Sequence, residues 1–258
     1  MLALNISYEM NPPKIVRNTS FDLDSLKQDL DKFHNRVSRL TSLVDSIHLT
    51  DSVLGVPRIS SISVAKDIRN SHGSVKLRCS VRVRDRNLSA IIQLVCDAIR
   101  AGVGGLLIVK GDKPERPSID SGLKPSSVVR ILNEQGFGDK IKLFLSVPCS
   151  PDLNKIKQKI DSKPYGFITQ SISSIDQLQN IVDNVKAYGI KVIPCIMVPS
   201  IKNKESAKMI NLDWRGYEKD IDSFIRRAHG MCGEVLVTSP NSFDDGMNVL
   251  KRLSGVMN

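Results

Sequence analysis

Short apolar runs alternate along this chain with longer stretches in which apolar residues recur every three or four positions. Recurrence at that spacing places apolar side chains on one face of a helix, whereas short β-branched runs are typical of buried strands. The short runs predict eight strands, at Leu4–Glu9, Val44–Thr50, Val75–Val83, Gly105–Lys110, Ile141–Val147, Tyr165–Thr169, Lys191–Met197 and Glu234–Thr238. The longer stretches predict helices over Leu23–Leu40, Leu88–Ile99, Val128–Leu132, Leu153–Ile160, Ile175–Val185, Ile221–Ala228 and Met247–Leu253. Thr19 and Asp22 fit the spacing of a capping box at the start of the first helix.

The order of these elements predicts the architecture. Strands that alternate with helices pair in parallel through right-handed crossovers. Eight such units in a chain of 258 residues match the size of a (β/α)8 TIM barrel, so we expect one catalytic domain over residues 1–258. A doubly wound open sheet is the alternative. The glycines between 102 and 105 precede a strand instead of opening a helix, however, so they do not form a dinucleotide-binding turn.

Composition narrows the class of protein. No apolar stretch approaches the length of about 20 residues that a membrane-spanning helix needs, and Glu9 interrupts the N-terminal segment, which does not read as a secretory signal. Five scattered cysteines without a C-x-x-C pair favour a reducing, cytoplasmic location over a disulfide framework or a zinc site. The net charge of +10 would attract anions. Because acids interleave with the cations, the pattern favours an ordinary solvated basic surface; attraction of an anionic small molecule is the functional alternative, and nucleic-acid binding ranks behind it.

Polar residues gather where the predicted strands end. In a barrel the loops after the strands converge on one mouth, which is where active sites lie. Glu9 ends the first strand, and burial there would raise its pKa and suit it to act as a general acid. Asp112 follows Lys110 and Gly111 at the end of the fourth strand. Two carboxylates at one mouth could divide acid and electrostatic roles, although each could also be an ordinary strand-end or turn residue.

The third predicted strand has one apolar and one cationic face. Its cationic face includes Arg78 and Arg82, which would point into the barrel if the apolar face meets the helices. An inward arginine needs an anion, either a carboxylate or a phosphate. An edge strand with a solvated basic face is the alternative interpretation. Asp85 and Asn87 are candidates to cap the helix that follows.

Several strand-end motifs, taken together, resemble those of one enzyme family. They are the segments S-Y-E-M-N-P-P-K at 7–14, L-T-D at 49–51, R-D-R-N at 84–87, K-G-D-K-P at 110–114, F-I-T-Q at 167–170 and V-I-P-C-I-M at 192–197. In this order, each at a predicted strand end, they resemble the methylenetetrahydrofolate reductases, which are flavoenzymes built on a (β/α)8 barrel. The resemblance implies reduction of 5,10-methylene-tetrahydrofolate, or of a related pterin, to its 5-methyl form by hydride transfer from reduced FAD, in one-carbon and methionine metabolism.

The resemblance also implies roles for individual residues. Glu9 matches the general acid that opens the methylene bridge, Asp112 matches an aspartate that serves catalysis and touches both folate and flavin, and Gln170 matches a substrate-binding glutamine. The residues that match FAD-binding positions are Thr50, Ser80, Arg82, Lys110, Gly111, Asp112, Val147, Asp152, Lys155 and Lys159. No metal site is expected.

This chain departs from the family pattern at several positions. Ser80 stands in place of a flavin-contacting histidine, Lys110 in place of an arginine, and Cys195 in place of a glycine. Two hypotheses follow. The first is a reductase that takes electrons from NAD(P)H or from a redox partner protein. The second is a non-redox homologue or partner subunit that binds the pterin without flavin. By analogy with the family we expect a homo-oligomer.

Overall fold

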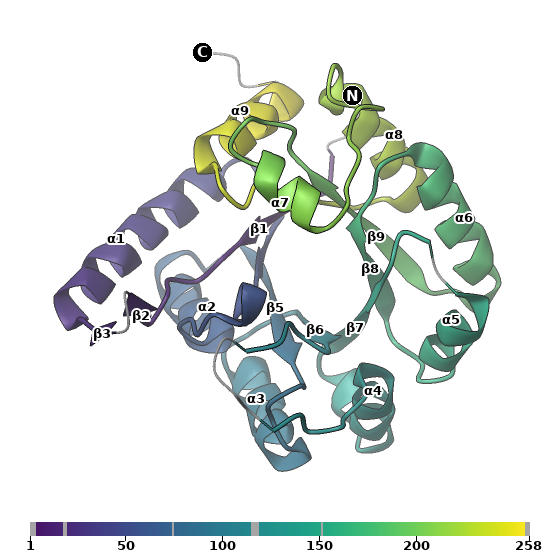
Figure 1. The fold of residues 1–258 in the computed structure, drawn as a ribbon. Coiled ribbons are helices and arrows are strands. Elements are labelled where there is room, and N and C mark those ends of the chain that lie inside the picture. Colours follow the sequence, from purple (N-terminus) through teal and green to yellow (C-terminus); the bar gives the residue numbers. More distant parts are fainter. Residues whose placement is uncertain (1–3, 18–19, 74, 115–118, 151, 256–258) are drawn as a thin grey trace.

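Eight parallel strands close into a barrel, as the alternation of elements predicts. The computed structural model describes residues 4–17, 20–73, 75–114, 119–150 and 152–255. The barrel strands are β1 (Ile6–Met10), β4 (Ser46–Leu49), β5 (Lys76–Arg82), β6 (Gly105–Val109), β7 (Lys142–Val147), β8 (Gly166–Ser171), β9 (Lys191–Met197) and β10 (Val235–Thr238). Each lies beside its neighbour in the chain, and β1 closes the ring between β4 and β10 (Figure 1). All eight predicted strands are therefore confirmed, and the open-sheet alternative is wrong.

Helices surround the barrel (Figure 1). They are α1 (Leu23–Leu40), α2 (Ser61–Ser71), α3 (Leu88–Arg100), α4 (Pro125–Glu134), α5 (Leu153–Ile160), α6 (Ile175–Val185), α7 (Lys204–Met209), α8 (Ile221–Cys232) and α9 (Phe243–Ser254). The described residues also form three short 3-10 helices, which are η1 (Val53–Gly55), η2 (Phe137–Asp139) and η3 (Lys186–Tyr188). In the described part of the chain, none of the helices is long and apolar enough to cross a membrane.

The structure corrects the prediction at several local points. Helix α1 is capped by Asp22, whose side chain accepts a hydrogen bond from the Asp24 amide, so the helix begins later than a cap at Thr19 would require; Thr19 itself lies outside the described residues. Asn87 caps α3 as expected. The periodicity did not predict α2, α7 or the small hairpin of β2 (Val16–Arg17) and β3 (Ser20–Phe21). These elements are short or carry too few apolar residues to form a clear stripe.

The barrel interior has three layers. A middle layer of apolar side chains comes from the five neighbouring strands β6 to β10 and consists of Leu107, Phe144, Ile168, Ile193, Cys195 and Leu236. Below it, at the amino ends of the strands, lies a cluster of charged and hydroxyl groups. Above it, at the carboxyl ends, the barrel opens into a pocket. The packed middle layer separates the two polar regions, so the barrel is a filled core and not a pore.

The lower cluster explains the cationic face of β5. Arg78 Nη2 lies 2.6 Å from Glu234 Oε1, and Lys191 Nζ lies 2.6 Å from Glu234 Oε2. Ser7 Oγ donates to the same carboxylate at 2.7 Å. The Arg78 guanidinium also stacks over the Phe144 ring, 4.7 Å from its centroid. The inward arginine therefore finds a carboxylate, as expected, and the edge-strand interpretation is wrong because β5 is paired on both sides.

Candidate functional site

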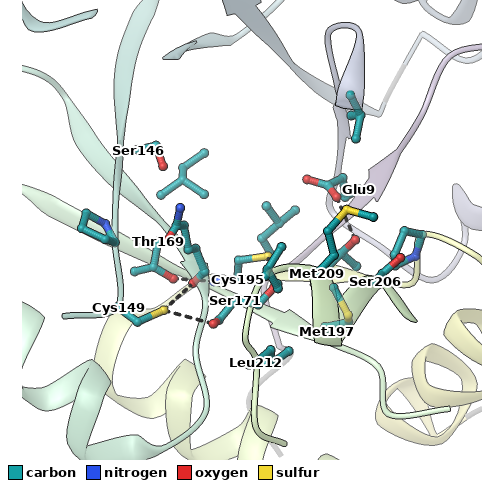
Figure 2. A pocket seen from close by; sticks show the side chains of 18 of the residues that line it. Glu9, Ser146, Cys149, Thr169, Ser171, Cys195, Met197, Ser206, Met209 and Leu212 are labelled. Atoms are coloured by element: carbon teal, nitrogen blue, oxygen red, sulfur yellow. Dashed lines mark hydrogen bonds between the residues drawn. The ribbon is translucent and has the colours of Figure 1, made fainter. Parts of the chain in front are cut away.

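The carboxyl ends of the strands surround a pocket of about 1090 Å³. Its floor is the apolar middle layer, where Leu107, Ile168, Cys195 and Leu236 face upward. Polar side chains from the strand ends and the following loops form its walls, among them Glu9, Ser146, Thr169 and Ser171 (Figure 2). This volume is slightly above the range of about 300–1,000 Å³ usual for small-molecule sites, so a large ring system can enter it.

Glu9 is the acidic group of this pocket. Strand β1 pairs with β10, and this pairing brings the Thr238 hydroxyl within 2.7 Å of Glu9 Oε1, to which it donates a hydrogen bond. Burial raises the pKa of Glu9, and the hydrogen bond from Thr238 opposes that rise without cancelling it. The expectation of a desolvated carboxyl group with a raised pKa is thus confirmed. A carboxyl group with a raised pKa keeps its proton to higher pH than an ordinary one and can donate it to a bound ligand.

Gln170 borders the same pocket from β8. The register between β8 and β9 shifts between Ile168 and Ser171, so the strand is irregular at this point. The Cys195 amide donates to the Thr169 side chain at 3.0 Å in place of a regular ladder bond. Such an irregularity re-aims side chains at strand ends. Because Gln170 is exposed to the pocket, its amide can both donate to and accept from a ligand.

Asp112 does not reach the pocket. Its carboxylate accepts a hydrogen bond from the Leu54 amide at 2.7 Å, and its side chain is otherwise exposed. A Cβ added at Gly55, where φ is +74°, would lie 2.2 Å from the Lys113 carbonyl oxygen, so the two loops are in close contact. Asp112 therefore holds the loop that carries Leu54, which does border the pocket. Among the described residues Glu9 alone supplies a carboxylate to the pocket wall in this arrangement, and a role for Asp112 beside it stays a prediction.

Four predicted FAD contacts have side chains that bind other protein groups. Thr50 donates to the Asn11 side chain at 2.6 Å, and the Ser80 hydroxyl lies 2.9 Å from His48 Nε2. Arg82 forms an ion pair of 2.5 Å with Asp85, and Lys110 forms one with Asp120. The structure groups none of the four with Glu9 and Gln170 around the pocket.

The remaining predicted contacts lie after β6, at the end of β7, and on or just before α5. Gly111 has a φ of +82° and sits against the Arg82 side chain, and Val147 is fully buried in the layer between strands and helices, so its side chain cannot meet a ligand. Lys159 donates to the Ser146 carbonyl at the pocket wall, where burial lowers its pKa. Asp152 precedes α5 and is exposed. Lys155 lies on α5, but its side chain is outside the described part of the chain.

This arrangement does not fit FAD. A flavin ring needs polar partners along its edge, and the residues expected to supply them are paired with other protein groups and do not line the pocket. Among them, Arg82 alone keeps two buried nitrogens, Nε and Nη1, without partners, but it does not line the pocket. Over the described ranges, no cluster of three or more His, Cys, Asp or Glu side chains could hold a metal ion.

Two cysteines in the pocket were not among the predicted site residues. Cys149 Sγ lies 3.0 Å from the Ser171 carbonyl oxygen, and Ser171 Oγ lies 3.6 Å from Cys195 Sγ. Burial, and secondarily the charge of Glu9, raises the pKa of Cys195, so this thiol stays protonated. Helix α7 and the segment after it also border the pocket through Met209, Leu212 and their neighbours (Figure 2). Cys149 and Cys195 both lie near strand ends in the sequence, and this placement was the one available signal for them.

Comparison with known proteins supports the fold and then the family. No curated protein matches the chain. Among solved structures, "QR15, an Aldolase" has a TM-score of 0.59 at 12% identity, covering 98% of this chain and 96% of that one. A chain of the tryptophan synthase complex from Pyrococcus furiosus has a TM-score of 0.58 at 12% identity, covering 98% of both. At such identity the likeness shows the barrel fold alone. The sequence model of methylenetetrahydrofolate reductase matches residues 3–212, and this chain belongs to that family.

Proposed function

We propose that this chain binds the pterin ring of a tetrahydrofolate-type substrate in the pocket above the barrel, as a single catalytic domain, and acts in its reduction. Family membership makes a reductase-like oxidoreductase the class to expect. The finer assignment is the conversion of 5,10-methylene-tetrahydrofolate, or a related pterin, to its 5-methyl form in one-carbon and methionine metabolism. The observation that carries it is the half-buried Glu9, with its raised pKa, facing the same pocket as Gln170.

Glu9 would act as the proton donor. Opening the methylene bridge of such a substrate requires a proton on the bridging nitrogen that leaves, and a carboxylic acid kept protonated by burial can supply it. Thr238 would hold the carboxyl group in position through its hydrogen bond. Gln170 would bind the ring edge through its amide, and the apolar floor would exclude water from beneath the ring.

The source of the hydride is a separate and more specific part of the proposal. Members of this family are generally flavin-dependent. The resemblance implies that FAD supplies the hydride and that NAD(P)H or a partner protein reduces it. Because the predicted FAD contacts do not fit in this arrangement, a second function has support from a specific observation: a homologue that binds the pterin without flavin, as a partner subunit. A homo-oligomer and a cytoplasmic location remain predictions.

Turnover tests the proposed reaction. Purified protein is supplied with methylene-tetrahydrofolate, FAD and, separately, NADH, NADPH or reduced ferredoxin, and 5-methyl-tetrahydrofolate is measured by chromatography. Glu9→Gln should lower the rate about 10²- to 10⁴-fold, the usual contribution of one general acid. Glu134→Gln on the exposed face of α4 is the matched control and should have no effect. Equal turnover by Glu9→Gln and the control would remove Glu9 from the mechanism.

A visible spectrum separates the two functions. The purified protein is scanned before and after denaturation, and any released chromophore is identified by chromatography. Stoichiometric FAD would support the reductase and show that the predicted contacts rearrange around the cofactor. A colourless protein that takes up no added FAD but still binds 5-methyl-tetrahydrofolate would support the flavin-free homologue.

A further inference from the structure

Two cations face each other at the rim of the pocket. Lys14, after β1, and Arg58, after β4, form an isolated antiparallel bridge. The flanking segments are joined by the Ile15 amide to the Pro57 carbonyl at 3.1 Å and by the Ile59 amide to the Pro13 carbonyl at 3.0 Å. Residues directly opposite in such a pairing place their side chains side by side. Both cations border the pocket that contains Glu9.

This pairing is unfavourable without an anion. Like charges directly opposite in an antiparallel pair destabilise it. In the described ranges no carboxylate forms an ion pair with either cation. Arg58 Nη1 donates to the Pro12 carbonyl at 2.7 Å, whereas its Nε is buried without a partner. Burial lowers the pKa of Arg58, so its charge is poorly solvated where it lies. A buried guanidinium nitrogen with no acceptor is costly unless a ligand supplies one.

We propose that Lys14 and Arg58 form a subsite for the anionic tail of the ligand whose ring lies at Glu9. This inference rests on the proposed function, since it assigns the second end of the same ligand. Residues 9 to 14 can span at most about 18 Å, so one extended molecule can reach from Glu9 to the cations along this segment. Arg58 is the anchor. Lys14, which is exposed and also borders a smaller hollow with Asp22 and Asp29, adds a second charge.

Two kinds of tail share the required chemistry. Glutamyl carboxylates and phosphate both accept hydrogen bonds from a guanidinium, and both are attracted by a neighbouring ammonium group. The position of the subsite at the open rim suits a tail of variable length, because its far end can extend into solvent. Salt should weaken the interaction, since the rim is partly exposed.

Titration calorimetry of the full chain tests the subsite. The ligands are 6-methyltetrahydropterin, which has no tail, tetrahydrofolate with one glutamate and with three glutamates, and inorganic pyrophosphate as competitor at constant ionic strength. The variants are Lys14→Gln, Arg58→Gln and Arg58→Lys, with Lys66→Gln and Arg100→Gln as exposed controls on α2 and α3. Lys14→Gln changes only an exposed side chain, so it tests the proposed subsite even if Arg58→Gln proves unstable.

The wild type should bind the tailed ligands more tightly than the tail-less pterin. Arg58→Gln should weaken tailed-ligand binding about 10-fold and Lys14→Gln about 3-fold, with the tail-less pterin unaffected and Arg58→Lys partly restoring affinity. If pyrophosphate competes strongly with the tailed ligands and affinity hardly rises from one glutamate to three, the subsite is assigned to phosphate. If affinity rises with the number of glutamates and pyrophosphate competes weakly, it is assigned to carboxylates. Equal binding of tailed and tail-less ligands, or equal losses in the control variants, would overturn the subsite and leave the proposed function standing. Failure of the folded wild type to bind any of the pterins would overturn both.

Discussion

The charged cluster at the amino end of the barrel makes a sharp stability prediction for Glu234→Gln. Burial alone would raise the pKa of Glu234, but the charge of Arg78 and hydrogen bonds from Lys191, Arg78 and Ser7 outweigh it and lower the pKa to about 2. Against an ordinary value of 4.5, this shift corresponds to about 3 kcal/mol that the ionised carboxylate contributes to folding. The side chain is only 7% exposed, so solvent screening removes little of it.

The substitution keeps the size of the side chain and removes its charge, leaving two cations around a neutral amide. We expect a loss of about 3 kcal/mol at pH 7, in the range for breaking a buried ion pair, and a fall in Tm of about 6–12 °C for a chain of this length. Glu134→Gln is the matched control on the surface, where its 3.9 Å contact with Arg130 should contribute at most about 0.5 kcal/mol.

The pH dependence of the stability difference tests whether the charge of Glu234 is its cause. A depressed carboxyl pKa stabilises the folded state above the unfolded pKa of about 4.5, and this contribution disappears as pH falls toward 2. Thermal unfolding followed by circular dichroism should therefore show the gap between wild type and Glu234→Gln narrowing from pH 5 to pH 2. A Tm change below 2 °C at pH 7, or a gap that does not vary with pH, would refute the reasoning.

Three further predictions concern the pocket and the core. In the wild type, kcat/KM should fall as pH rises through the raised pKa of Glu9, and in Glu9→Gln this fall should vanish; an unchanged pH–rate profile would contradict this. The Tm of Glu9→Gln at pH 8 should be higher than that of the wild type, because the variant has no partly desolvated carboxylate that must ionise. Thr238→Val removes a hydrogen bond that favours the carboxylate, so the same pH–rate limb should move to higher pH, and a move to lower pH would count against it. Gly246→Ala would place a Cβ 2.1 Å from the Tyr8 hydroxyl, and calorimetry should show a loss of about 1–3 kcal/mol unless that ring can shift.

Periodicity was enough to predict the barrel, and position was enough to predict Glu9. The eight apolar runs are long and alternate regularly with helical stripes, so their identity and order follow from local patterns. Glu9 was found because it lies at the carboxyl end of a buried strand, and its raised pKa has the expected cause. Short polar helices such as α7 left no stripe to detect, although α7 borders the pocket.

Contacts between distant residues could not be predicted in the same way. Glu234 meets Arg78 across 156 positions of sequence, and the need for an anion near Arg78 was visible while its identity was not. The contact of Asp112 with Leu54 was not predicted, for a related reason. A turn aspartate can hydrogen bond to any nearby amide, and the left-handed backbone of Leu54 presents one to it. Only the folded arrangement decides between that amide and the pocket.

The central claim is that the pocket above the barrel binds a tetrahydrofolate-type pterin beside Glu9, and titration of 5-methyl-tetrahydrofolate into two forms of the protein tests it most directly. The first is the wild type, and the second is Ser146→Phe, which adds a ring to the half-buried pocket wall. The account predicts saturable binding by the wild type and at least a 10-fold loss in the filled variant. No binding by the folded wild type, or equal binding by both, would contradict it.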